Sequence, residues 1–136
     1  MKRPWVAVVL GLCLAACGGD DDDDDDDGGK EPETGSTCPS SDRPTYDNFA
    51  RNFMTTYCTP CHASTLEGAA RQGAPVGYDL DTLDGIRDDF SADVLDRYAA
   101  AGPKKVNALM PPTTFMPQPP EAERRKLGQW LACGLR

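Results

Sequence analysis

The clearest pattern in this sequence is an apolar stripe over residues 46–57. Phe49, Phe53 and Tyr57 stand four residues apart, a spacing that places their side chains on one face of an α-helix. Two more apolar residues lie beside this face, Ala50 and Met54. We therefore predict a helix here, with its apolar face turned toward the core.

A second stripe lies near the C-terminus. The prolines and acidic residues of positions 119–123 are typical of a helix start, because proline fits the first turn and acids favour the positive end of the helix dipole. Leu127, Trp130 and Leu131 follow at helical spacing. Gly134 then predicts the end of this helix.

Weaker helical patterns lie between these stripes, over residues 82–86 and 91–101. Gly85 and the aspartates at positions 88 and 89 favour breaks there, since glycine and aspartate are poor residues inside helices. No segment alternates apolar and polar residues over the length of a substantial strand. The fold class that the pattern predicts is all-α.

The first residues predict export. Two basic residues precede an apolar stretch over residues 5–14, which is the order found in secretory signals. The stretch runs into Leu14-Ala15-Ala16-Cys17, which resembles the lipobox of bacterial lipoproteins, where the cysteine receives diacylglycerol before the signal is removed. The resemblance implies a signal peptide over residues 1–16 and a lipid on Cys17. The alternative is an ordinary secreted protein that keeps Cys17 as an odd thiol.

Residues 17–37 are predicted to form a disordered acidic tether. After Cys17 the segment contains no aliphatic, aromatic or further cysteine residue, so it has no apolar surface with which to offset the entropy lost on ordering. Its consecutive aspartates, Asp20 to Asp27, repel one another and favour an extended chain, with binding of calcium or of a basic partner as the alternative. The folded domain is then residues 38–136.

The formal net charge of −8 comes largely from that aspartate run. The chain has 22 acidic and 14 basic residues; without the eight aspartates of the run and the two basic residues of the leader, 14 acids face 12 bases. The domain is therefore close to neutral. It has no basic stretch that would neutralise phosphates, which argues against a nucleic-acid partner.

The six cysteines divide by position. Two lie in the leader, two form a close pair further along, and Cys38 and Cys133 stand at opposite ends of the domain. Such usage suits an oxidising compartment, in which Cys38 and Cys133 are candidates for a disulfide that closes almost the whole domain. The alternative is two unpaired thiols.

The close pair belongs to Cys58-Thr59-Pro60-Cys61-His62, a C-x-x-C-H sequence of the kind that attaches c-type haem. Cys58 and Cys61 are spaced so that their sulfurs can reach the two vinyl groups on one edge of a porphyrin. The adjoining His62 can then ligate the iron. Haem is attached covalently outside the cytoplasm, which agrees with the predicted leader.

Two other sites would use the same residues. A thioredoxin-type dithiol of Cys58 and Cys61 needs βαβ surroundings, and no alternating apolar strand precedes the motif. A structural zinc site would need both cysteines, His62 and a fourth ligand from Cys38 or Cys133, which strains the geometry. Covalent haem is the prediction that the motif favours.

The order of these features resembles class I cytochromes c. A helix running into C-x-x-C-H, a methionine-proline loop at residues 110–112 and a final helix ending in Trp-Leu are similar to that family, and to bacterial lipoprotein cytochromes in particular. The resemblance covers residues 38–136 and is weakest over residues 63–105. It implies a small cytochrome c-like fold in which the N- and C-terminal helices cross beside a covalently bound haem. Such a crossing would bring Cys38 and Cys133 together.

The chain contains a single histidine, His62, so ligation of the iron by two histidines is excluded. Methionine is the natural distal ligand, and Met110 precedes two prolines that favour an extended, rigid segment. Met116, with one proline after it, is a second candidate, but the resemblance favours Met110. The remaining alternatives are Lys104, Lys105 and an open distal site.

Ligation by histidine and methionine raises the haem potential and leaves no open position for a substrate, which is typical of an electron carrier. The sequence therefore predicts a protein that is not an enzyme and that exchanges electrons with redox partner proteins. It would be exported and lipid-anchored to a bacterial envelope membrane, on the periplasmic or cell-surface side. The alternatives are a haem-containing redox subunit of a larger enzyme complex, and a haem sensor or enzyme with an open distal site.

The lipobox generates the first testable prediction. Cys17→Ser should abolish acylation and impair signal removal, because the lipid is attached to that thiol. Cys13→Ser, which changes the other leader cysteine, should leave both unchanged. Membrane fractionation and the mass of the N-terminal peptide measure the effect, and a wild-type peptide without acyl mass would contradict the prediction.

Overall fold

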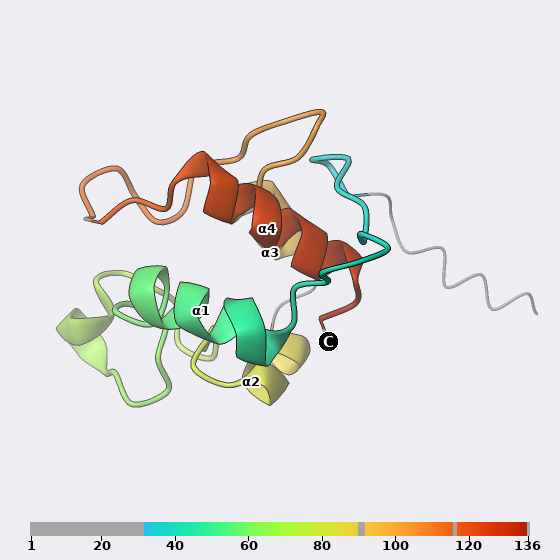
Figure 1. Cartoon of the computed structure of the whole chain (residues 1–136). Helices are drawn as coiled ribbons and strands as arrows, with labels where there is room; N and C mark the ends of the chain where they lie inside the picture. Colours follow the sequence, from blue (N-terminus) through green and yellow to red (C-terminus); the bar gives the residue numbers. More distant parts are fainter. Residues whose placement is uncertain (1–31, 90–91, 116, 136) are drawn as a thin grey trace, which may run out of the picture.

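The chain folds as an assembly of short helices (Figure 1). The computed structural model describes residues 32–89, 92–115 and 117–135, and strand pairing within these ranges is limited to an isolated bridge between Ala101 and Val106. The all-α prediction is therefore confirmed. In chain order the elements are a π-helical turn at Tyr46–Ala50 (η1), α1 at Arg51–Tyr57, a 3-10 turn at Gly68–Arg71 (η2), α2 at Leu83–Asp89, α3 at Ala92–Ala99 and α4 at Glu121–Ala132.

Some predicted features lie outside the described residues. They include the signal peptide at residues 1–16, Cys17, the aspartate run and Met116. Among the described residues, no helix combines the length and the apolar character needed to cross a membrane.

The helix predicted over residues 46–57 is present as η1 followed directly by α1. Thr45 begins it with a reciprocal cap: its Oγ1 accepts from the Asn48 amide at 3.2 Å, and its own amide donates to Asn48 Oδ1 at 2.7 Å. The apolar face is buried as predicted, with Phe49 and Phe53 packed ring against ring at 5.7 Å between centroids. This face supplies one wall of the core.

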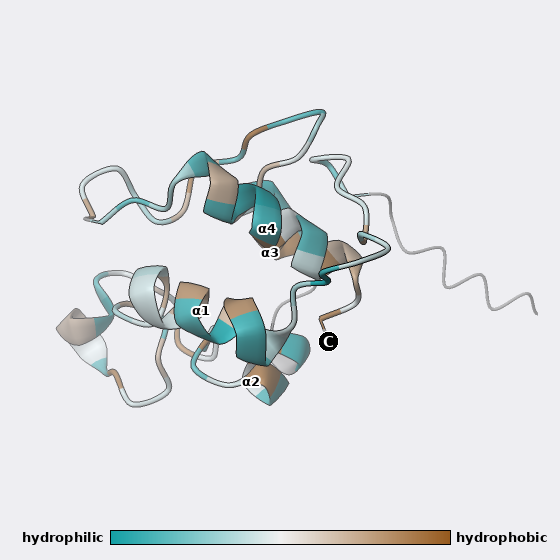
Figure 2. Cartoon of the chain, viewed as in Figure 1, coloured by the Kyte–Doolittle hydropathy of each residue, from teal (hydrophilic) through white to brown (hydrophobic). Residues whose placement is uncertain are grey.

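The last helix, α4, supplies the facing wall. It begins directly after Pro120 and ends at Ala132, with Gly134 in a left-handed conformation at φ 75°. Leu127 and Trp130 are fully buried, as their spacing predicts. The side of α4 seen in Figure 2 is mainly hydrophilic, so the helix is amphipathic.

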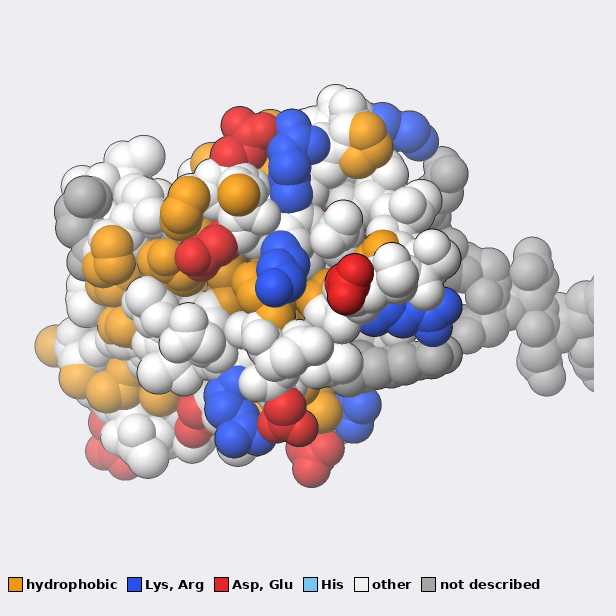
Figure 3. Space-filling view, in the orientation of Figure 1, with side chains coloured by type: hydrophobic (Ala, Val, Ile, Leu, Met, Phe, Trp, Pro, Cys, Tyr) orange, Lys and Arg blue, Asp and Glu red, His pale blue; other side chains and the backbone are white. Residues whose placement is uncertain are grey.

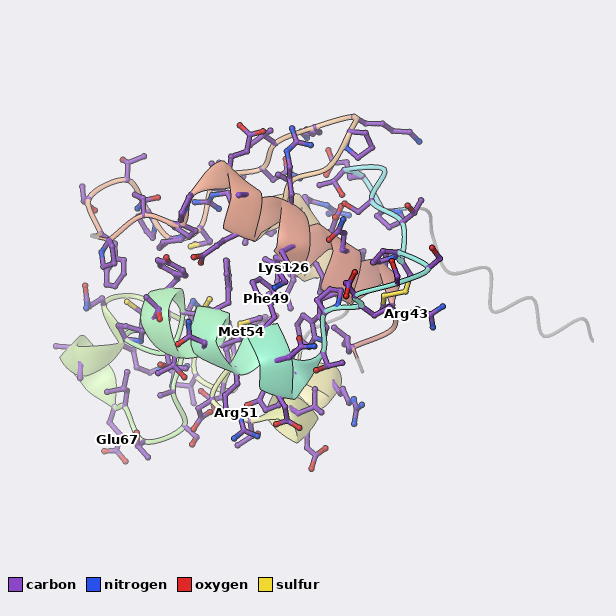
Figure 4. All side chains as sticks on the ribbon, viewed as in Figure 1. Arg43, Phe49, Arg51, Met54, Glu67 and Lys126 are labelled. Atoms are coloured by element: carbon purple, nitrogen blue, oxygen red, sulfur yellow. A yellow bond between two sulfur atoms is a disulfide. The ribbon has the colours of Figure 1, made fainter. Side chains whose placement is uncertain are left out.

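The first and last helices lie opposite each other (Figure 1). At one end, the Lys126 ammonium lies 5.1 Å from the centroid of the Phe49 ring, and the two side chains meet between the helices in Figure 4. At the other end, burial and the carboxylate of Glu123 both raise the pKa of Tyr57. The predicted contact between these helices is therefore present. α3 packs against the other side of α4.

Cys38 and Cys133 form a disulfide, with their Cα atoms 4.7 Å apart across a sequence separation of 95 residues. The prediction of this pair is confirmed. The bond joins the segment that leads into η1 to the end of α4. It removes both sulfurs from the set of ligands available to a zinc ion.

The folded part of the chain begins earlier than predicted. The expected boundary at Cys38 is wrong, because Thr34 and Ser36 are buried against the domain. Thr34 bonds the Asp96 carboxylate through both its amide, at 3.0 Å, and its hydroxyl, at 2.5 Å, and Ser36 donates to the Ala101 carbonyl at 3.2 Å. Hydrogen bonds to a buried carboxylate hold this segment, so it needs no apolar residue.

The break expected at Gly85 is also wrong, since α2 runs through this position. The Gly85 amide donates to Thr82 Oγ1 at 3.0 Å, so the threonine caps the start of the helix. The glycine also suits this turn, where an added Cβ would lie 3.0 Å from Thr82 Oγ1, a tight contact.

The packing of α4 generates a prediction about Gly128. A Cβ atom there would lie 2.7 Å from the Ala101 carbonyl oxygen and would also meet the Ser36 hydroxyl. Gly128→Ala should therefore lower the free energy of unfolding by about 1–3 kcal/mol, because backbone must shift to admit the methyl group. Urea denaturation measures the change, with Gln129→Ala on the exposed side of the helix as a near-neutral control. Unchanged stability of Gly128→Ala would contradict the close packing.

Candidate functional site

The C-x-x-C-H motif lies in the turn that ends α1. The Cys58 amide donates to the Met54 carbonyl at 2.8 Å, and so closes the helix. The amides of Cys61 and His62 then both donate to the Cys58 carbonyl, at 3.1 and 2.9 Å. This turn places Cys58, Cys61 and His62 at one end of the helix.

The His62 ring is oriented by the chain that follows it. Its Nδ1 lies 3.0 Å from the carbonyl oxygen of Tyr78, and a carbonyl can only accept, so Nδ1 carries the proton. In the neutral ring the lone pair is therefore on Nε2, the atom that would face a metal. The His62 carbonyl accepts from the Leu80 amide at 2.7 Å, which fixes the backbone as well.

Arg71 organises the loop that carries the Tyr78 carbonyl. It is 3% exposed and pairs with Asp79 at 2.9 Å. Its guanidinium also donates to the same Tyr78 carbonyl that accepts from His62, at 3.2 Å. Four further carbonyls accept from it, those of Ala63, Leu66, Ala74 and Pro75. Sequence reasoning missed this residue, because its partners are mostly backbone groups that no sequence pattern marks.

A second link holds the residues directly after the motif. Ser64 donates through its hydroxyl to Asp81 at 2.7 Å and through its amide at 3.3 Å. The side-chain hydrogen bond from Ser64 lowers the pKa of Asp81. The loop is therefore tied at both of its ends.

The two motif cysteines are free thiols, and both are partly buried. Burial raises the pKa of the Cys58 thiol to about 12, although the Arg124 guanidinium acts in the opposite direction. At neutral pH this thiol is protonated. Redox-active dithiols instead depend on a thiolate with a lowered pKa, so the electrostatics disfavour the thioredoxin-type alternative.

Met110 is held at its backbone by α3 and α4. Its amide donates to the Tyr98 carbonyl at 2.8 Å, and its carbonyl accepts from Arg124 at 2.7 Å. Because Arg124 also acts on Cys58, it connects the Met110 segment with the motif. The alternative candidate, Met116, lies outside the described residues.

The two lysines that were alternative distal ligands lie beside the N-terminal segment instead. Lys105 forms an ion pair with Glu33, whose pKa is lowered mainly by that hydrogen bond. The Lys104 amide donates to the Thr34 carbonyl at 2.9 Å, and its side chain lies against Gly35. These contacts favour methionine over lysine.

The donor set fits haem better than a bare metal ion. Within the described residues, no group of three or more histidine, cysteine or acidic side chains is arranged to hold a metal. A porphyrin supplies four nitrogen ligands of its own, so the protein has to add only axial ligands and two thiols. Cys58, Cys61 and His62 meet that requirement, and Met110 offers a thioether.

Apolar side chains are concentrated on one side of the molecular surface. They gather at the left of Figure 3, on the side where residues 110–115 and η2 lie in Figure 1. Val76 and Leu109 are among the exposed apolar residues, at 86% and 65%.

Comparison of the chain with protein-family models, with curated proteins and with solved structures gives no match in any of the three.

The loop that orients His62 generates a stability prediction. Arg71→Met should lower the free energy of unfolding by about 2–4 kcal/mol, because it leaves buried carbonyls and the Asp79 carboxylate without their donor. Arg51→Met is the matched control, since Arg51 is exposed and its pair with Asp47 on the helix surface contributes little. Urea denaturation of both variants measures the difference. Equal stability of the two variants would contradict the role of Arg71.

Proposed function

We propose that this chain is a single-haem c-type cytochrome, similar to class I, that carries electrons outside the cytoplasm. The observation that carries the proposal is the complete C-x-x-C-H motif, whose His62 donates from Nδ1 to the Tyr78 carbonyl. That hydrogen bond selects the tautomer that leaves Nε2 available to a metal and fixes the orientation of the ring. The protonated thiol of Cys58 supports attachment over dithiol exchange.

Each residue has a separate task in this proposal. Each task is that of a haem-holding residue: Cys58 and Cys61 would hold the porphyrin through thioethers, and His62 and Met110 would ligate its iron. When bound, the haem supplies one-electron chemistry through its ferrous and ferric states. With His62 and Met110 both bound to the iron, no position would remain for a substrate, which favours a carrier over an enzyme.

The proposal extends to location and partners. The lipobox-like leader supports attachment to a bacterial envelope membrane through Cys17, on the periplasmic or cell-surface side. The near-neutral domain with exposed Val76 and Leu109 offers redox partner proteins an apolar surface in place of a strongly charged one.

Covalent haem is the first test of this function. The full chain, expressed with a haem-attachment system, should give a red protein whose haem stays on the polypeptide in a denaturing gel. Replacing both Cys58 and Cys61 by alanine should remove that haem, whereas Cys38→Ser should keep it. His62→Ala should keep the thioethers but lose the low-spin spectrum. Loss of all haem from the wild type on denaturation would overturn the proposal.

The distal ligand is tested by comparing two methionines. The oxidised wild type should have the weak near-infrared band of iron bound to methionine. Met110→Ala should erase this band and Met116→Ala should not. The opposite result would transfer the role to Met116. If neither variant changes the spectrum and the reduced wild type binds carbon monoxide readily, the distal site is open and the chain is a sensor or an enzyme.

A further inference from the structure

Arg124 is buried, and its hydrogen-bond acceptors within the described part of the chain are carbonyl groups and a side-chain amide. It lies in the second turn of α4 and is 3% exposed. Its guanidinium donates to the carbonyls of Ala99 at 2.8 Å, Asn107 at 3.3 Å and Met110 at 2.7 Å, and to Gln118 Oε1 at 3.3 Å. Burying a charge on neutral acceptors is costly, and a buried pair or charge is weak evidence for stability alone.

The four acceptors place Arg124 at the base of the loop that carries Met110. Gln118, which accepts from Arg124, itself donates to the carbonyls of Pro112 and Phe115 at 2.8 and 2.7 Å. One arginine therefore holds the chain both at Met110 and at Gln118. A guanidinium can do this because its five N–H donors lie in one rigid plane.

The same cation acts on the haem-attachment motif. Although burial raises the pKa of Cys58, the Arg124 guanidinium lowers it, and the Cys58 and Tyr57 side chains in turn act on Arg124. Arg124 is thus coupled electrostatically to the turn that holds Cys58 and hydrogen-bonded to the segment that holds Met110. Arg124 can therefore affect both the placement of the Met110 segment and the electrostatic potential at the attachment motif.

We propose that Arg124 is a positioning residue for the distal ligand, and that its fixed charge raises the reduction potential of the haem. This inference rests on the proposed function. Oxidation adds a positive charge to the iron, and a cation held nearby in a medium of low dielectric disfavours that charge. Sulfur ligation raises the potential as well, so a loop held in place by Arg124 acts in the same direction.

The next residue along α4 is a matched control. Arg125 is exposed and pairs with Glu121, and it also donates to the Gly102 carbonyl at 3.1 Å. Arg125→Leu removes the same charge and the same side-chain volume from the same helix. It should leave the distal loop and the potential unchanged.

The experiment compares the holoproteins of wild type, Arg124→Leu, Arg124→Lys and Arg125→Leu, each as the full chain. The readouts are the near-infrared band of the oxidised form, carbon monoxide binding by the reduced form, the midpoint potential and the urea midpoint. Arg124→Leu should weaken the band, bind carbon monoxide more readily by roughly tenfold or more, and have a lower potential. Arg124→Lys keeps the positive charge but loses the planar set of five donors. Its midpoint potential should therefore be closer to the wild-type value than its near-infrared band is.

One set of results assigns Arg124 a purely structural role and overturns the proposal. In that set Arg124→Leu unfolds at lower urea, but its folded form keeps the wild-type band, carbon monoxide binding and potential. If Arg124→Leu yields no holoprotein, Arg124→Lys and Gln118→Ala decide in the same assays. A weakened band in both supports the proposal, and wild-type spectra and potentials in both overturn it.

Failure of the underlying function has a different signature. If the wild-type chain carries no haem on a denaturing gel, both the proposed function and this inference are wrong. This result is obtained before any Arg124 variant is compared. A wild type with covalent haem and an unaffected Arg124→Leu removes this inference alone.

Discussion

Buried carbonyl groups of irregular chain must find donors that no helix or sheet supplies, and this constraint shapes the domain. Two buried arginines supply those donors. Arg71 donates hydrogen bonds to carbonyls of the loop after the motif, and Arg124 donates to carbonyls of the segments that precede α4. Each arginine also reaches a carbonyl next to the candidate site, at Tyr78 and at Met110. The bonds that make the loops stable are therefore the bonds that orient the site.

The helices at the two ends of the domain were predictable because their signal is local. Periodic apolar residues and the proline-acid start of α4 belong to single segments, and the structure follows them closely. The N-terminal segment was not predictable. Thr34 is buried by hydrogen bonds to Asp96, a residue 62 positions away, and such a bond leaves no apolar pattern in the sequence.

The candidate site divides in the same way. The motif could be found from sequence because its two thiols and imidazole are neighbours in the chain. Its supporting residues could not, since Arg71 and Arg124 are bound mainly to backbone carbonyls, which every residue possesses. Met110 stood out by its prolines, but its connection with the motif depends on Arg124 and so on the fold.

The N-terminal segment also determines at which end of the domain the upstream chain is attached. Residues 32–38 lie at the disulfide end of α4, whereas residues 110–115 and η2 lie at the opposite end of the paired helices (Figure 1). Thr34 and Ser36 bind the segment to the domain, so the upstream chain is attached at the disulfide end of α4. If Cys17 carries the proposed lipid, the anchor is connected to the end of the domain that is remote from the candidate site. Under the proposed function, the side with Cys58, Cys61 and His62 would then lie on the far side of the domain from the attachment point.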